Sequence, residues 1–142
     1  LHADSILTPD CAAALARHIS RNWNVLGYFD LRFLADGPPL MGINSFGAWW
    51  RSRLFGLPFG DQGFVLSRRL LDELHGFDTT VTSGEDHDFI WRARAAGAKL
   101  RAVGASLHTS ARKYALNGWR RTTGQHLRET WRQARLFSRR AT

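Results

Sequence analysis

Strand-like and helical runs alternate through the first 111 residues, and this alternation constrains the fold more than any other feature. Residues 25–33 place apolar side chains, among them Val25, Phe29 and Phe33, on one face and Asp30 and Arg32 on the other. Helices are predicted at 10–21, 43–54, 68–74 and 85–96, and further strands at 1–4, 63–66, 99–103 and 106–109. The pattern predicts an α/β domain with a mixed or mainly parallel sheet.

Polar residues and glycines mark where the predicted helices begin and end. Asp10, Ser67 and Ser83 stand at positions typical of helix N-caps. Gly76 and Gly97 follow two of the predicted helices, where glycine commonly ends a helix.

The composition is that of a folded globular chain, with 44% hydrophobic and 23% charged residues among 142. No run of eighteen apolar residues exists, which excludes a predicted membrane span, and the first residues lack the pattern of a secretory signal. Cys11 is the single cysteine, which excludes an intrachain disulfide and a multi-cysteine zinc site. Its apolar surroundings predict a small buried thiol, which fits a reducing cytoplasm.

Positive charge is concentrated at the C-terminal end. Residues 1–111 hold eleven basic and eleven acidic side chains, whereas residues 112–142 hold nine basic side chains and only Glu129 as an acid. The whole net charge of +8 therefore lies in the last thirty-one residues. This polarity indicates an anionic partner for the tail and not a nucleic-acid-binding body.

The tail is predicted to be a basic amphipathic helix over residues 115–142. Its less polar positions fall at helical spacing: Trp119, Thr123, Leu127, Trp131, Ala134 and Phe137. Two interpretations stay open. The helix packs on the domain with a solvated basic surface, or it lies on an anionic leaflet, where each basic residue contributes about 1 kcal/mol.

Two short segments carry residue types that bind metals and phosphates. His2 and Asp4 lie at a predicted strand end, where a carboxylate and an imidazole can bind a divalent ion on a diphosphate. His108 is a candidate third ligand, and Arg112 and Lys113 can neutralise diphosphate charge. The alternatives are a polar strand exit for the first segment and a basic surface loop for the second.

Two further segments carry carboxylates. Asp61 and Gln62 lie between two glycines, which let a backbone approach a ligand closely, although a plain turn explains them equally well. Residues 83–88 begin a predicted helix and contain Glu85, Asp86 and Asp88. Crowded carboxylates raise one another's pKa, which suits a general base. Acids in the first turn also favour the helix dipole, so a purely structural role stays open.

Taken in order, these segments resemble the second half of inverting family-2-like glycosyltransferases of the A-type fold. The resemblance extends to a bacterial subgroup often encoded beside radical-SAM proteins, whose members are similar at residues 2–4, 27–33, 56–63, 85–86 and 109–112. The resemblance covers nearly the whole chain. It implies a Rossmann-like mixed sheet flanked by helices, in which residues 1–114 form the acceptor-side half and the nucleotide-binding N-terminal half is absent.

The resemblance implies metal-dependent transfer of a sugar from a nucleoside-diphosphate sugar to an acceptor hydroxyl, with inversion. Asp86 is then the base that deprotonates the acceptor, and Glu85 holds that acceptor. Asp4 is the metal-binding carboxylate for Mg²⁺ or Mn²⁺, and His2 stands where many relatives carry an aspartate. On this basis a chain beginning inside the metal motif is expected to be inactive by itself.

The same resemblance assigns Asp61 and Gln62 to the wall of the sugar or acceptor pocket. A lipid-linked acceptor would make a membrane-binding tail useful, so the expected location is the cytoplasm, peripheral to the inner face of the membrane. The competing interpretation is a non-catalytic basic module, for anionic lipid or RNA, with a transferase-like shell. RNA binding predicts basic residues across the sheet, and because the positive excess lies only in the tail, no nucleic acid is expected.

Overall fold

The protein is a mixed α/β structure with a four-stranded mixed sheet and six α-helices in the residues that can be described. The structure, a computed structural model, describes residues 4–19, 24–81 and 83–140. The elements in chain order are β1 (Ser5–Ile6), α1 (Pro9–Ile19), β2 (Val25–Phe33), α2 (Met41–Leu54), the 3₁₀ turn η1 (Gly60–Gln62), β3 (Phe64–Val65), α3 (Arg68–Glu73), α4 (Glu85–Ala95), β4 (Lys99–Thr109), α5 (Arg112–Asn117) and α6 (Trp119–Arg140).

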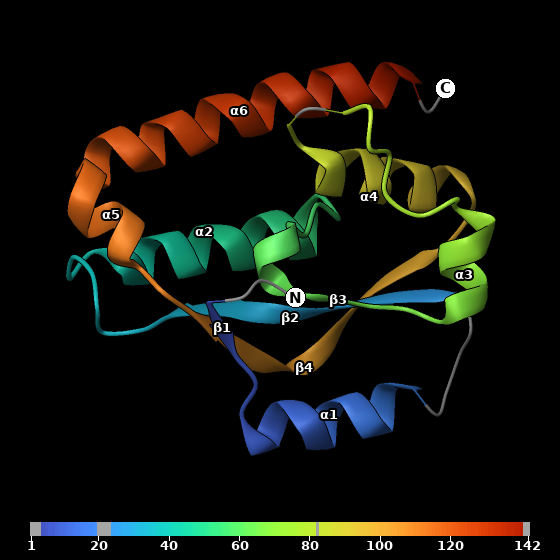
Figure 1. Ribbon diagram of the computed structural model, residues 1–142, viewed down its shortest axis with the longest axis horizontal. Helices are drawn as coiled ribbons and strands as arrows, with labels where there is room; N and C mark the ends of the chain where they lie inside the picture. The colour runs from blue at the N-terminus through green and yellow to red at the C-terminus, as the bar shows by residue number, and fades with distance from the viewer. Residues whose placement is uncertain (1–3, 20–23, 82, 141–142) are drawn as a thin grey trace.

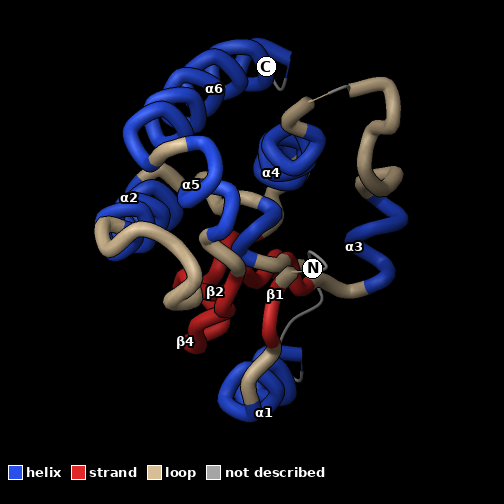
Figure 2. Tube along the Cα trace, turned by 60° about the vertical axis from the view of Figure 1, so that its left-hand side comes forward, coloured by secondary structure: helices blue, strands red, loops and turns tan. Residues whose placement is uncertain are grey.

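The sheet has the strand order β1-β4-β2-β3. The central strands β2 and β4 are parallel, and the short strands β1 and β3 pair antiparallel at the two edges. Helix α1 covers one face of the sheet, while α2 and α4 lie on the other face with α6 running across them (Figure 1). Figure 2 shows the same layers from the side. The mixed sheet agrees with the sequence prediction.

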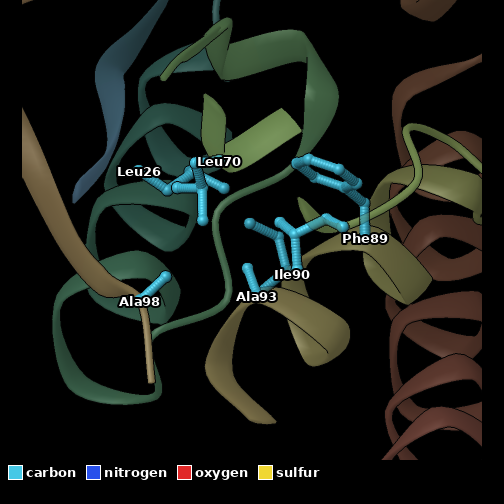
Figure 3. Close-up of a cluster of buried hydrophobic side chains, with 7 residues drawn as sticks. Leu26, Leu70, Phe89, Ile90, Ala93 and Ala98 are labelled. Atoms are coloured by element: carbon cyan, nitrogen blue, oxygen red, sulfur yellow. The ribbon is translucent and has the colours of Figure 1, made fainter. Parts of the chain in front are cut away.

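Strand β2 is buried on both faces over most of its length. The sequence pattern had predicted one apolar face and one polar face. Leu26 belongs to a core with Leu70, Phe89 and Ile90, on the side of α3 and α4 (Figure 3). Phe29 packs instead with the buried thiol of Cys11, on the α1 side. A central strand of a parallel pair has helices on both faces, so apolar residues occupy both sets of alternating positions.

Strand β4 is continuous where the sequence predicted two strands. Its pairing with β2 is irregular, because Tyr28 faces Ala102 whereas Asp30 faces Ser106. Gly104, at φ 88°, lies in the extra stretch of β4. A bulge therefore carries the strand past the glycine at which the sequence pattern broke.

Helix α6 packs on the domain through one side. Thr122, Gln133 and Phe137 are buried there, whereas Arg128 and Arg132 are exposed on the outer side. None of the helices within the described residues is long and apolar enough to cross a membrane.

Candidate functional site

The loop between α2 and β3 is held from below by Gln62, whose side chain is fully buried. Its Oε1 accepts hydrogen bonds from Ser52 Oγ at 2.8 Å and from the Phe59 backbone N at 3.1 Å. Its Nε2 donates to the Phe29 carbonyl of β2 at 3.0 Å. Because these bonds meet the needs of a buried amide, the loop has one defined position. Gln62 thus has a structural role and fixes the position of its neighbour Asp61, which lines a cavity described below.

Asp86 joins this loop to the start of α4. Its Oδ2 accepts a hydrogen bond from the Gly60 backbone N at 2.7 Å, and its Oδ1 accepts one from the His87 N at 2.9 Å. Two of the predicted segments, 60–63 and 83–88, are therefore in direct contact, although Gly60 and Asp86 are 26 residues apart in the chain.

The beginning of α4 depends on a glycine and not on the predicted serine cap. Gly84 is the N-cap residue, at φ 85°, and no side chain caps the helix. A Cβ on Gly84 would lie 2.5 Å from the Gln133 side chain of α6. The prediction that Ser83 is the N-cap is wrong, because the chain enters α4 through a left-handed conformation at Gly84, and this conformation favours glycine.

Arg51 of α2, which is half-buried, brings a positive charge to the loop. Its Nε donates to the Leu57 carbonyl at 2.8 Å, and its guanidinium lies 3.2 Å from the centre of the Phe59 ring. Burial lowers the pKa of Arg51 to about 10, against the opposing effect of the Asp61 and Asp86 charges. The side chain therefore remains protonated at neutral pH, near two carboxylates.

His87 is buried beside the same loop. Its ring centre lies 3.9 Å from that of Phe59. Burial lowers the pKa of His87 to about 4, against the charge of Asp86, which raises it. His87 is therefore neutral at pH 7, and its Nδ1 has no hydrogen-bond partner among the described residues.

These groups surround a polar cavity of about 390 Å³, called here the carboxylate cavity. Its wall includes four carboxylate residues, Asp61, Glu85, Asp86 and Glu129, together with Phe59, Ser83, Gly84, His87, His126, Thr130 and Gln133. Carboxylates accept hydrogen bonds from hydroxyl groups, whereas they repel phosphates. The cavity is therefore suited to a polyhydroxyl ligand and unsuited to a diphosphate.

A larger cavity of about 670 Å³, the apolar cavity, lies next to it among β2, α2, α4 and α6. Both cavities are lined by Phe59, Asp61, His126 and Thr130. Tyr114 of α5 lines the apolar cavity and packs edge-on against Phe33 at 5.6 Å between ring centres. Burial and the charge of Asp61 raise the pKa of Tyr114, which keeps its hydroxyl protonated at neutral pH.

Of the predicted metal ligands, Asp4 lies just before the edge strand β1 and His108 lies on the neighbouring strand β4. Asp4 is exposed in the turn before β1, whose Ser5 pairs with Thr109 of β4. Thr109 in turn pairs with Phe33, which lines the apolar cavity, so Ser5 is about two strand spacings, roughly 10 Å, from that wall. His108 is half-buried on β4, and His2 lies outside the described residues.

Within the described part of the chain, no three acidic, histidine or cysteine side chains come together as a metal site. Asp4 and His108 supply at most two ligands. A divalent ion at this edge would therefore depend on ligands from a bound diphosphate, as Mg²⁺ commonly does.

The predicted phosphate-binding cations are exposed on α5. Arg112 donates to Ser110 Oγ at 3.0 Å and lies 3.9 Å from Asp36. Asp36 also accepts a hydrogen bond from the Ala111 backbone N at 2.7 Å. Neither Arg112 nor Lys113 lines the two cavities. The segment at 109–112 is thus held by Asp36, a contact that the sequence pattern did not indicate.

Arg51, His126 and Phe59 are among the site residues that received no role from the sequence. Arg51 and His126 lie in helices that carry several other polar side chains, and Phe59 precedes the Gly-Asp-Gln-Gly segment. His126 could be located only once α6 was placed over the domain.

Comparison of the chain with protein-family models, with curated proteins and with solved structures found no match in any of the three.

Proposed function

We propose that the protein transfers a sugar from a nucleoside-diphosphate sugar to an acceptor hydroxyl, with Asp86 as the general base. The observation that carries the proposal is the hydrogen bond from Gly60 N to Asp86 Oδ2, which unites two acidic segments in the wall of one cavity. The carboxyl end of β2, which runs parallel to β4, lines the adjoining apolar cavity, and this arrangement supports an A-type transferase fold.

In the proposed reaction the acceptor hydroxyl lies in the carboxylate cavity. Its oxygen attacks the anomeric carbon of the donor as Asp86 takes its proton, and the bond to the nucleoside diphosphate breaks. Backbone N–H groups already bind both oxygens of Asp86, which fixes the carboxylate, and each oxygen keeps capacity for a further hydrogen bond. A single displacement of this kind inverts the anomeric configuration.

The other carboxylates of the cavity have binding roles in this proposal. Glu85, which is exposed at the first position of α4, and Asp61 accept hydrogen bonds from further acceptor hydroxyls. Mg²⁺ or Mn²⁺ would supply positive charge to the leaving diphosphate, held by Asp4 with His2 or His108.

Asp86→Asn tests the proposal directly. The variant keeps one acceptor oxygen for the backbone but loses the base, so turnover should fall by roughly 100-fold or more. Nucleoside-diphosphate release and glycoside formation are measured for the full-length protein with a panel of sugar nucleotides. Donor affinity and the thermal unfolding profile report separately on binding and folding.

Asp72→Asn is the matched control. Asp72 is an exposed carboxylate of α3 that pairs with Arg68, and it lines neither cavity. It should keep wild-type turnover. Near-normal turnover in a folded Asp86→Asn protein would refute the assignment of the base.

A second candidate function, binding to an anionic surface, is favoured by one observation. The exposed outer side of α6 carries Arg121, Arg128 and Arg132, while the opposite side packs on the domain. Such a surface is compatible with peripheral contact at the inner face of a membrane, whether or not the protein is an enzyme.

A further inference from the structure

The apolar cavity is kept open by small residues on its helices. Gly47 and Ala48 face it from α2, and Ala134 faces it from α6. A Cβ built on Gly47 would meet no heavy atom within 4 Å. The helices therefore leave a space of about 670 Å³, within the usual range for small-molecule sites.

Aromatic and aliphatic side chains form most of the wall. Phe33, Phe59 and Trp91 line it, and so does Trp131, whose side chain is 67% exposed. Exposed apolar surface of this kind is unfavourable in water and is relieved when an apolar ligand covers it. The wall therefore matches a ligand with an apolar body.

The cavity is continuous with the proposed reaction site. Phe59, Asp61, His126 and Thr130 line both the apolar cavity and the carboxylate cavity. A ligand whose body fills the first space therefore has its end next to the wall that contains Asp86.

The charges of the wall restrict the body further. Arg51, Arg94 and Arg135 line the apolar cavity against a single carboxylate, Asp61. Burial and the positive charge of Lys113 lower the pKa of His126, so this histidine is neutral at pH 7. A cationic body is disfavoured, whereas a neutral or anionic one is accepted.

We propose that the apolar cavity binds the apolar body of the acceptor, a hydroxyl-bearing amphiphile whose polar end reaches the carboxylate cavity. This inference rests on the proposed transferase function, since it names the class of acceptor. The body is neutral or anionic, and either a ring system or an alkyl chain has the required chemistry.

The test measures binding without donor, metal or turnover. Octyl glucoside below its micellar concentration, phenyl glucoside and methyl glucoside are titrated calorimetrically into the full-length protein. Burial of the octyl or phenyl group should tighten binding by at least about tenfold over methyl glucoside. A stronger effect of octyl indicates a chain-like body, and an equal or stronger effect of phenyl indicates a ring.

Gly47→Leu should remove that preference by filling the cavity, and leucine suits a helix better than glycine does. Gly42→Leu is the matched control: Gly42 also lies in α2, its Cβ position is open, and it lines neither cavity. The control should bind all three probes as the wild type does, which also separates the cavity from adsorption to other apolar surface.

Equal binding of the three glucosides to the wild type would overturn the inference, and so would an octyl or phenyl preference that survives in Gly47→Leu. Asp86→Asn separates the two proposals. It should keep the octyl or phenyl preference, because the three probes carry the same sugar, while it loses transfer. A failure of the assigned base therefore leaves the test of the apolar cavity intact.

Discussion

Gln62 is fully buried and Arg51 is half-buried, and each is tolerated there because its hydrogen-bond partners lie beside it. An unpaired buried guanidinium or amide costs several kcal/mol. Arg51 Nη2 donates to Gln62 Oε1 at 3.2 Å, and both side chains also bind backbone groups of the same loop. These hydrogen bonds hold the loop that carries Asp61 in one position. A fixed cavity wall is needed to place a reacting hydroxyl precisely.

His87 predicts a specific dependence of stability on pH. The folded state has the lower pKa, about 4 against 6.5, so its contribution is complete above pH 6.5. As the pH falls from 6.5 towards 4, His87 becomes protonated in the unfolded chain but stays neutral in the folded protein, so the free energy of unfolding decreases. His87→Gln should therefore flatten this part of the profile, by up to about 3 kcal/mol in the free energy of unfolding.

Denaturant titrations at pH values from 4.5 to 7.5 measure the effect as the difference between wild type and variant. The pKa values of His18 and His126 are also lowered by burial, and both residues remain in each protein, so the difference isolates His87. Parallel profiles for the two proteins would show that His87 does not titrate as inferred.

At the scale of elements, sequence patterns located most helices and strands because local chemistry decides them. Ser67 is confirmed as the N-cap of α3, since its side chain accepts a hydrogen bond from Leu70 N at 3.1 Å. The same reasoning failed at Ser83, because the N-cap of α4 is Gly84, which has a left-handed backbone and lies beside Gln133 of the distant α6. Local patterns contain no information about such a contact.

The candidate site divides in the same way. Asp61, Glu85 and Asp86 were identified from short segments, and the structure brings all three to one cavity. Arg51 and His126 were not, because their importance arises only when α2 and α6 meet the loop in space. The apolar cavity could not be predicted either, because the periodicity of a sequence does not indicate where the packed helices leave a space between them.

The contact between α4 and α6 gives a prediction at this scale. Gly84→Ala should lower the free energy of unfolding by at least about 1 kcal/mol more than Gly97→Ala. Both glycines have positive φ, 85° and 76°, but only the Cβ at position 84 would collide with Gln133. Thermal and denaturant unfolding provide the measurement.

A double variant identifies the cause. Gln133→Ala removes the obstructing side chain, so adding it to Gly84→Ala should recover part of the lost stability and reveal a favourable coupling. Equal losses for Gly84→Ala and Gly97→Ala would mean that α6 does not constrain the turn.

At the scale of the whole molecule, opposite charges are separated. Carboxylates gather in the cavity beneath α6, while Arg121, Arg128 and Arg132 are exposed on the outer side of that helix. This polarity gives the molecule an electrostatic orientation near an anionic surface, with α6 towards that surface. A ligand drawn from such a surface would enter beside α6, which also lines the apolar cavity.

The last prediction follows from that orientation: the protein should bind vesicles that contain anionic lipid, through α6. Arg128→Gln with Arg132→Gln should weaken binding by about tenfold or more, because each exposed arginine contributes about 1 kcal/mol near the surface. Arg68→Gln with Arg69→Gln removes equal charge from α3, where both arginines are exposed and paired with acids, and should have little effect. Vesicle sedimentation at increasing salt measures binding, which should weaken as salt screens the charges. Equal binding to neutral vesicles, or equal losses in the two double variants, would exclude an electrostatic role for α6.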